Sequence, residues 1–243
     1  MSVELRMLRM RFDSGRLYEL GRRRRLPPRT DLGYLLHCQL REMFGPESPT
    51  PFAVRDGSGR SVAVLAYSTR AAAELQRHAQ QFAQPDVYGT CDWNAFDEKP
   101  MPGQWRTGER VGFEVRCCPV VRMSGDGPRW RAGAEVDAFL ARCWRTEGTV
   151  EREAVYREWL ADELGRRGGA RIVSARVLGH QRAHLVRRDH RPERKAIGGE
   201  RPEAVFSGEL DVTDPEAFAA LLARGVGRHR GFGFGMLLLR PPE

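Results

Sequence analysis

The sequence has few lysines, no long apolar run, and cysteines whose spacing suggests no pairing. Among its 40 lysines and arginines, only Lys99 and Lys195 are lysines. Its five cysteines are odd in number and none has CxxC spacing, so neither a disulfide framework nor a zinc site is expected. No stretch approaches the roughly 18 apolar residues of a membrane span, and the N-terminus lacks the apolar core of a signal peptide. We therefore expect a protein of the reducing cytoplasm with no membrane partner.

Several catalytic and cofactor motifs are also missing. The chain has no Walker motif, no GxGxxG between a strand and a helix, and no GxSxG. These absences argue against a P-loop enzyme, a dinucleotide-binding fold and an α/β-hydrolase. His180, His184 and His190 lie close together in the sequence, but no cysteine or carboxylate stands at a useful ligand spacing from them. We expect neither a metal nor a cofactor.

The composition is that of a globular protein with excess positive charge. The 243 residues fit one large domain or two small ones. A hydrophobic content of 41% is enough for a core. The net charge of +8 favours a polyanionic partner, although scattered surface arginines would give the same total.

Hydrophobic periodicity predicts two similar sets of elements. The elements expected in the first set are a strand at 3–12, a loop around the arginines and prolines of 22–28, a helix at 32–44, hairpin strands at 52–55 and 61–67, and a helix from a Ser68 or Thr69 cap to 82. The irregular segment 84–108, which can contain one edge strand, ends this set. The second set comprises a strand at 111–121, helices at 134–145 and 151–167, strands at 171–187 and 204–212, a helix at 215–223 and a strand at 233–240.

This order predicts an α+β protein with tandem ferredoxin-like (RRM-like) domains and antiparallel sheets. We place the domains at residues 1–108 and 109–243. No sequence repeat relates the halves, so the prediction depends on element order alone. Four-stranded sheets of this kind are a common RNA-binding architecture.

The segment 225–235, here called the glycine loop, is the most informative part of the chain. Five glycines alternate with basic and aromatic residues just before the last apolar strand. Glycine lets the backbone approach a ligand closely, and arginine supplies charge and a planar fork for phosphate. We therefore predict an RNA-binding loop whose contacts include Gly227, Arg228, His229, Arg230, Gly231 and Gly233.

The expected helix at 32–44 carries residues suited to acid–base chemistry. Tyr34, His37 and Arg41 follow one another at spacings of three and four, along one edge of the helix. A histidine can exchange a proton near neutral pH, and a tyrosine hydroxyl can bind a phosphate. We predict His37 and Tyr34 as catalytic and Arg41 as RNA-binding. The plainer interpretation is a boundary histidine beside a tyrosine that only packs.

A basic hairpin is expected between residues 171 and 201. Its charges suit the backbone of an RNA duplex, which proteins read by shape and phosphate. An ordinary solvated loop is the alternative. The predicted RNA-binding residues there are Arg182, Arg187, Arg188, Arg191, Arg194 and Lys195.

Four consecutive arginines precede the Tyr34 helix. We predict that Arg22, Arg24 and Arg25 bind RNA and that Arg23 is catalytic, with the run lining a phosphate path to His37. A basic loop without such a role is the alternative.

Three features together resemble the CRISPR repeat-processing endoribonucleases of the CasE (Cse3) branch, type I-E. The first is the glycine loop with the preceding Val212-Thr213-Asp214-Pro215. The second is Tyr34-x-x-His37 on a helix opened by Asp31. The third is the segment 112–116 leading to Pro119, followed by a helix with Tyr156 and Trp159. The longer arginine-rich segment before the Tyr34 helix departs from the family pattern, and a divergent type IV processing enzyme, in which arginines carry more of the chemistry, is the alternative branch.

The resemblance implies a prokaryotic antiviral-defence protein that cleaves CRISPR precursor RNA at the base of a repeat hairpin without metal. The 2′-hydroxyl attacks the adjacent phosphate, leaving a 2′,3′-cyclic phosphate and a 5′-hydroxyl. It gives His37 the role of general acid or base and Tyr34 that of its partner, and Arg230 matches a basic loop position. The implied partners are the repeat hairpin, as precursor and mature crRNA, and other subunits of a Cascade-like complex. A non-catalytic RNA-binding subunit of such a complex is the competing hypothesis.

Overall fold

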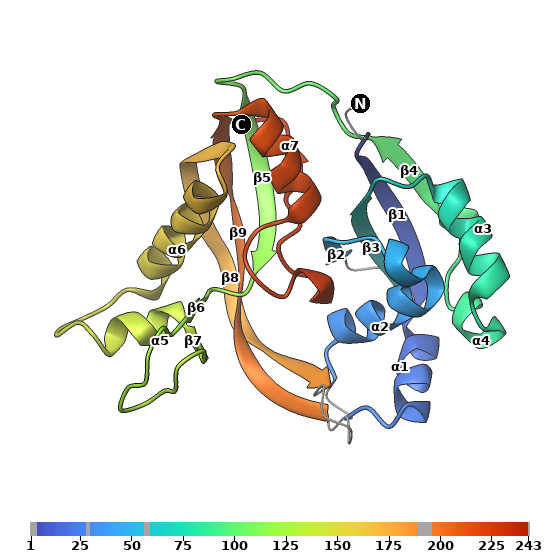
Figure 1. The fold of residues 1–243 in the computed structure, drawn as a ribbon, viewed down its shortest axis with the longest axis horizontal. Coiled ribbons are helices and arrows are strands. Elements are labelled where there is room, and N and C mark those ends of the chain that lie inside the picture. The colour runs from blue at the N-terminus through green and yellow to red at the C-terminus, as the bar shows by residue number, and fades with distance from the viewer. Residues whose placement is uncertain (1–3, 28–29, 56–58, 189–195, 243) are drawn as a thin grey trace.

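Two four-stranded antiparallel sheets lie side by side in the computed structural model, which describes residues 4–27, 30–55, 59–188 and 196–242 (Figure 1). The strands of the first sheet are β1 (Arg6–Asp13), β2 (Phe52–Arg55), β3 (Ser61–Ser68) and β4 (Asp97–Pro100). Those of the second sheet are β5 (Arg110–Cys117), β8 (Ala170–Arg188), β9 (Ala196–Val212) and β10 (Leu238–Arg240). The sheet orders are β2-β3-β1-β4 and β10-β5-β9-β8.

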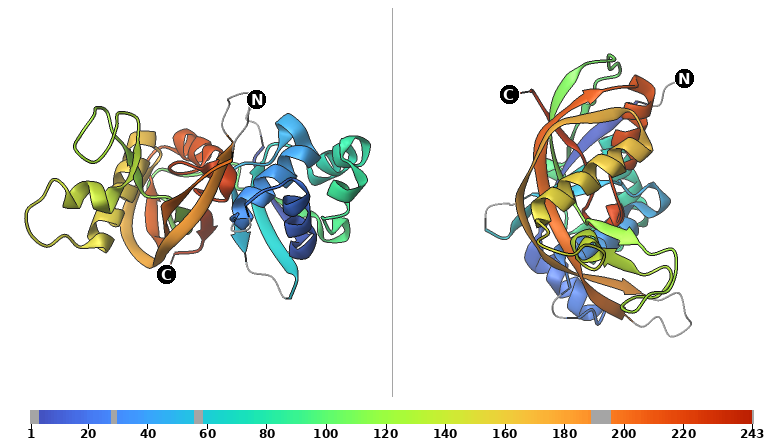
Figure 2. Two further views of the ribbon diagram at one scale, coloured as in Figure 1. Left: turned by 90° about the horizontal axis from the view of Figure 1, so that it is seen from below. Right: turned by 90° about the vertical axis from the view of Figure 1, so that its left-hand side faces the viewer.

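Helices cover one face of each sheet, and a small lobe extends from the second. Of the helices in the described segments, none is both long and apolar enough to cross a membrane. The helices are α1 (Ser14–Arg23), α2 (Leu32–Phe44), α3 (Ala72–Phe82), α4 (Pro85–Tyr88), α5 (Ala138–Cys143), α6 (Arg152–Arg167) and α7 (Pro215–Arg224). The lobe contains α5 with the short strands β6 (Val120–Arg122) and β7 (Glu135–Asp137), at the end of the molecule away from the first sheet (Figure 2).

The strand order confirms the predicted α+β class with tandem ferredoxin-like units. In each sheet the first strand of the set lies between the third and the fourth, and the second strand is at the edge. Every pairing within the two sheets is antiparallel. The boundaries at 1–108 and 109–243 stay a prediction.

Some expected elements were wrong in type or extent. No element was predicted between the first strand and the loop at 22–28; the structure has the helix α1 there, so the loop begins after Arg23. Asp13 caps α1 by accepting from the Arg16 N–H at 3.1 Å, and Leu17 and Leu20 are buried. The expected helix at 134–145 begins as strand β7, because Val121 and its neighbours on β6 pair with it. Helix α3 begins after Ala71 without a side-chain cap, so the cap at Ser68 or Thr69 was also wrong.

Two other boundaries in the second half differ from the prediction. The expected strand at 111–121 is interrupted after Cys117 and resumes as β6, which belongs to the lobe. The last strand is confined to Leu238–Arg240, because the chain from 233 to 237 follows a looped course against the core.

Contacts between the two sheets fix their relative position. The Tyr67 hydroxyl, on β3, donates to the Leu237 carbonyl at 2.7 Å, and burial raises the pKa of Tyr67. Arg55 on β2 donates to Glu114 on β5 at 2.6 Å. Tyr67 also belongs to the hydrophobic core of the second sheet. Strands β2 and β3 of the first sheet are thus held against the second unit.

The hairpin formed by β8 and β9 extends well beyond the second sheet. Its far end reaches the region of α1 and α2 (Figure 1). There Val186 is fully buried in a cluster with Leu26, Tyr34 and Leu35. The hairpin predicted to hold RNA therefore packs directly on the helix predicted to carry the catalytic residues.

Candidate nucleic-acid interface

A partly buried polar network ties the N-terminus of α2 to the second sheet. Asp31 caps α2 by accepting from the Gly33 N–H at 2.9 Å, and its carboxylate lies 3.8 Å from the Arg116 guanidinium. Arg116, on β5, donates to Glu203 of β9 at 2.6 Å and lies over the Phe234 ring at 4.2 Å. Burial raises the pKa of Asp31, although the charge of Arg116 opposes this. The network fixes the start of the Tyr34/His37 helix relative to the glycine loop.

The glycine loop packs directly against α2. A Cβ atom on Gly33 would lie 2.2 Å from the Phe232 carbonyl oxygen, so only glycine allows this approach. The His37 and Phe232 rings pack in a T-shaped arrangement at a centroid distance of 4.8 Å, and the Tyr34 ring centroid lies 5.7 Å from that of Phe232. A Cβ on Gly231 would be 3.3 Å from His37 Nδ1. The imidazole therefore lies between the helix and the loop.

The surroundings of His37 favour its neutral form. Burial lowers its pKa below the ordinary value of 6.5, and the positive charge of Arg41 acts in the same direction. A hydrogen bond with the backbone of Gly231 opposes both effects without reversing them. A neutral imidazole can accept a proton, which is the state that a general base requires.

Tyr34 lies beside His37 but is largely buried. Its ring centroid is 6.2 Å from that of His37, and 5% of the residue is exposed. It packs among Leu35 and Val186 and touches Phe232. Three elements far apart in the sequence, namely α2, the far end of β8 and the glycine loop, therefore meet at one place.

Glu135 of β7 holds the basic residues of the glycine loop. Arg228 Nε donates to it at 2.6 Å, His229 Nε2 lies 3.0 Å from it, and Arg201 lies at 3.7 Å. His229 adopts a left-handed backbone conformation with φ of 60°. The hydrogen bond with His229, followed by Arg228, lowers the pKa of Glu135 to about 2. The carboxylate therefore fixes the loop conformation that brings Phe232 to His37.

We expect the variant Glu135→Gln to lower the free energy of unfolding at pH 7 by about 2 kcal/mol, because it removes the central charge of a partly buried ion-pair cluster. The folded-state pKa of Glu135 is depressed, so its contribution is present above pH 4.5 and is lost as the pH falls toward about 2. The difference between wild type and variant in urea unfolding should therefore shrink across that range.

The matched control for this prediction is Glu158→Gln. Glu158 also pairs with an arginine, Arg142 at 2.6 Å, but 56% of its side chain is exposed. We expect a loss below about 0.5 kcal/mol there. Equal losses for the two variants, or a Glu135 loss that does not change with pH, would contradict the assigned role.

The predicted loop residues fall in different environments. His229 is 3% exposed in its side chain and faces Glu135, whereas 42% of the Arg228 side chain is exposed. Arg230 donates to the Arg224 carbonyl at 2.7 Å. Gly227 and Gly233 both have positive φ, at 70° and 81°. Their RNA contacts stay predictions, as does that of Gly231.

The arginine run lies at the end of α1. Arg23 pairs with Glu19 at 2.5 Å and with Asp86 at 3.7 Å, and the described contacts do not join it to His37. Arg24 pairs with Glu42 of α2. Exposed positions are occupied by Arg22, Arg25 and Arg41. The run thus borders α2, and its catalytic and RNA-binding roles stay predictions.

The basic hairpin is only partly described. Arg182 is half exposed and lies 3.9 Å from Glu200. The backbones of Arg187 and Arg188 pair with β9 at Ile197 and Ala196. The predicted contacts Arg191, Arg194 and Lys195 lie outside the described residues, together with His190. Among the residues that the structure does describe, no three His, Cys, Asp or Glu side chains could hold a metal ion.

Sequence reasoning missed three residues that shape the site. Glu135 was assigned to a helix, so its partnership with the loop was not anticipated. Phe232 was noted as part of the glycine loop and Arg116 as part of the segment 112–116. Their positions in the sequence did not indicate that Phe232 contacts His37 or that Arg116 lies beside Asp31. The repeated aromatic residues of the glycine loop were the available signal for Phe232.

The comparison with known families decides the classification. A model of the family described as CRISPR associated protein matches residues 10–241. The chain belongs to this family. This CRISPR-associated protein is also 28% identical over 160 residues to the CRISPR-associated endoribonuclease Cse3 of Thermus thermophilus, covering 62% of the chain and 68% of that relative.

Solved structures share the fold of this CRISPR-associated protein. A structure of Cse3 bound to a 19-nucleotide RNA matches with a TM-score of 0.65 at 19% identity, over 98% of this chain and 100% of that one. The Thermus thermophilus Cse3 complex with an RNA representing a pre-cleavage state matches at 0.63 and 19% identity, over 98% and 100%. Cas6e of Escherichia coli K-12 matches at 0.63 and 17% identity, over 97% and 99%.

Proposed function

We propose that the protein is a metal-independent endoribonuclease that cleaves CRISPR precursor RNA at the base of a repeat hairpin and stays bound to the product. The observation that carries the proposal is the meeting of His37, the glycine loop and the far end of the basic hairpin at one place. The family membership and the named activity of the Thermus relative support it.

The proposed reaction is an internal transesterification. His37 takes the proton of the 2′-hydroxyl, whose oxygen attacks the adjacent phosphorus. The bond to the 5′-oxygen breaks, so the products are a 2′,3′-cyclic phosphate and a 5′-hydroxyl after that oxygen gains a proton. The lowered pKa of His37 supports the role of base. Such a group typically contributes about 10²–10⁴-fold.

In this proposal, arginines and backbone N–H groups around the imidazole stabilise the negative charge of the transition state. The scissile phosphate gains negative charge in the transition state, and preorganised donors lower its energy most effectively in a partly dry site. The exposed Arg41 lies on the same helix as His37, and the Tyr34 hydroxyl is the proposed partner at the phosphate. In this proposal the β8–β9 hairpin holds the RNA stem, and the phosphate contacts make affinity fall steeply with salt.

A non-catalytic RNA-binding subunit of a CRISPR ribonucleoprotein is the second candidate function. The observation that favours it is the closure of the site: Tyr34 is 5% exposed, and Phe232 packs on the His37 ring. Both candidates include assembly with other subunits of a Cascade-like complex in a prokaryotic cytoplasm. They differ in whether His37 takes part in RNA cleavage.

The test is incubation with repeat RNA from the same genome in the presence of EDTA. We expect cleavage with EDTA present, and none when the nucleotide before the scissile phosphate is 2′-deoxy, because the attacking hydroxyl is then missing. The products of the unmodified RNA should carry a cyclic phosphate. Cutting through the deoxy position would refute internal attack, and loss of cleavage with EDTA would refute metal independence.

A further inference from the structure

A groove runs along the glycine loop, beside the contact between Phe232 and His37. It has a volume of about 650 Å³ and is bordered by the C-terminal ends of α6 and α7. Four arginines line it, namely Arg167, Arg224, Arg228 and Arg230. Glu135 is the only carboxylate of the described residues among its lining side chains.

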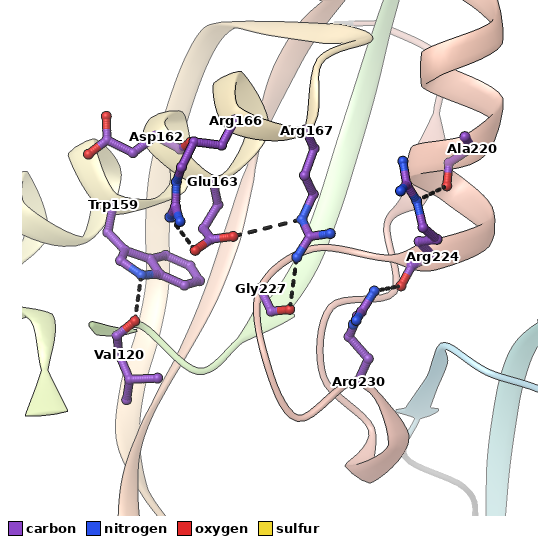
Figure 3. A network of polar contacts seen from close by, with 10 residues as sticks. All are labelled: Val120, Trp159, Asp162, Glu163, Arg166, Arg167, Ala220, Arg224, Gly227 and Arg230. Atoms are coloured by element: carbon purple, nitrogen blue, oxygen red, sulfur yellow. Dashed lines mark hydrogen bonds and ion pairs between the residues drawn. The ribbon is translucent and has the colours of Figure 1, made fainter. Parts of the chain in front are cut away.

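Backbone contacts hold three of these arginines around the same space (Figure 3). Arg230 Nη1 donates to the Arg224 carbonyl at 2.7 Å, and Arg167 Nη2 donates to the Gly227 carbonyl at 3.4 Å. Arg224 Nε donates to the Ala220 carbonyl at 3.4 Å. A guanidinium group has five N–H donors, so each arginine retains donors for a ligand while its position is fixed.

The carboxylates near the groove already bind other positively charged side chains. Glu163 lies 3.8 Å from Arg167 but also accepts a hydrogen bond from Arg166. Glu135 is bound by residues of the glycine loop and by Arg201. Among the described carboxylates, none forms an ion pair with Arg224 or Arg230. Three positive groups thus line one groove with little compensation, which an anion would supply.

Helix ends explain only part of this arrangement. Positive side chains are favourable near helix C-termini, where carbonyl groups have no partner in the helix. That accounts for Arg167 and Arg224, in the last turns of α6 and α7. It does not account for Arg230, which reaches from the loop to join them. Burial and the charges of both neighbours lower its pKa, so the grouping is unfavourable without a ligand.

We propose that Arg167, Arg224 and Arg230 form a phosphate-binding subsite for single-stranded nucleotides adjoining the scissile phosphate. The proposal rests on the proposed function, because it assumes that the reacting phosphate lies at His37. The groove ends at Gly231 and Phe232, which contact His37, so the neighbouring nucleotides of the same strand reach the arginines. Its volume of about 650 Å³ is that of a pocket for drug-sized molecules, which suits nucleotides of a single strand.

The test compares RNA ligands of three designs, each with a 2′-deoxy nucleotide at the scissile position. One is the repeat hairpin alone, and the others add a short single strand on its 5′ or its 3′ side. We expect one flank to tighten binding to the wild type in fluorescence anisotropy. Arg224→Gln should lower the affinity for that flanked RNA about tenfold. It should also reduce the slope of log affinity against log salt by about 0.7, the value for one phosphate contact to single-stranded nucleic acid.

Control variants and a separate cleavage assay make the outcomes distinct. Arg157→Gln removes an exposed arginine of α6 outside the groove and should change nothing. Arg224→Lys, which keeps the charge, should recover part of the affinity. Equal losses for hairpins with and without a flank, or no gain from either flank in the wild type, would overturn the subsite. Failure of the wild type to cleave unmodified repeat RNA would instead overturn the proposed function.

Discussion

His37→Ala should lower the cleavage rate of repeat RNA by about 10²–10⁴-fold while RNA affinity stays within about twofold. The size follows from the loss of a group that moves a proton in the transition state. Affinity is expected to persist because the hairpin and the arginines, not the imidazole, provide the phosphate contacts. Single-turnover cleavage and anisotropy binding, measured on the same RNA, separate the two effects.

The pH dependence of cleavage should identify the role of His37. Burial and Arg41 lower its pKa, so the neutral form predominates at pH 7 and is lost as the pH falls through a value below 6.5. If His37 is the base, kcat/KM rises with pH through that value and then levels off, because this ratio reports the free enzyme. A rate that instead falls as the pH rises through this range would assign His37 as the acid.

The control for this prediction is His78→Ala. His78 is also a helical histidine of the first unit, on α3, where its ring packs against Phe82 at 4.8 Å. We expect cleavage to remain within about twofold of the wild type. Unchanged cleavage by His37→Ala would remove His37 from the mechanism and favour the non-catalytic RNA-binding subunit.

Gly33→Ala should reduce cleavage by at least about 100-fold although it adds a single methyl group. The new Cβ would lie 2.2 Å from the Phe232 carbonyl oxygen and 2.7 Å from the Asp31 carboxylate. Because the first of these is backbone, the loop must move away from α2, taking Phe232 and Gly231 from His37. A displacement of about 1 Å at a catalytic group can cost 10²-fold. Overpacking should also cost about 1–3 kcal/mol of stability.

Gly165→Ala is the matched control for Gly33→Ala. Gly165 lies in α6, and an added Cβ there meets no atom within 4 Å. Alanine is favoured over glycine in a helix by up to about 1 kcal/mol, so this variant should be slightly more stable and equally active. If Gly33→Ala cleaves like the wild type, the packing of the loop on α2 is not needed for activity. Thermal unfolding and single-turnover cleavage of both variants decide the matter.

The sequence allowed prediction of most elements because their signals are local. The 13-residue helix Leu32–Phe44 was expected at its observed bounds, since Asp31 and the apolar spacing are read within one segment. Helix α1 was missed because arginines dominate its surface and only a few of its side chains are buried. The start of β7 was missed because its pairing with β6 depends on a partner more than ten residues away.

By itself, the sequence determined which chemical groups are available: an imidazole and a phenol on one helix, a basic hairpin and a loop of alternating glycine, arginine and aromatic residues. The tertiary structure decided which of them meet. The contact of Gly33 with Phe232 and the grouping of Arg167 with Arg224 and Arg230 join residues from separate elements. Periodicity and motif spacing describe neighbours along the chain, whereas these contacts arise only when two sheets pack and bring distant segments into the same volume.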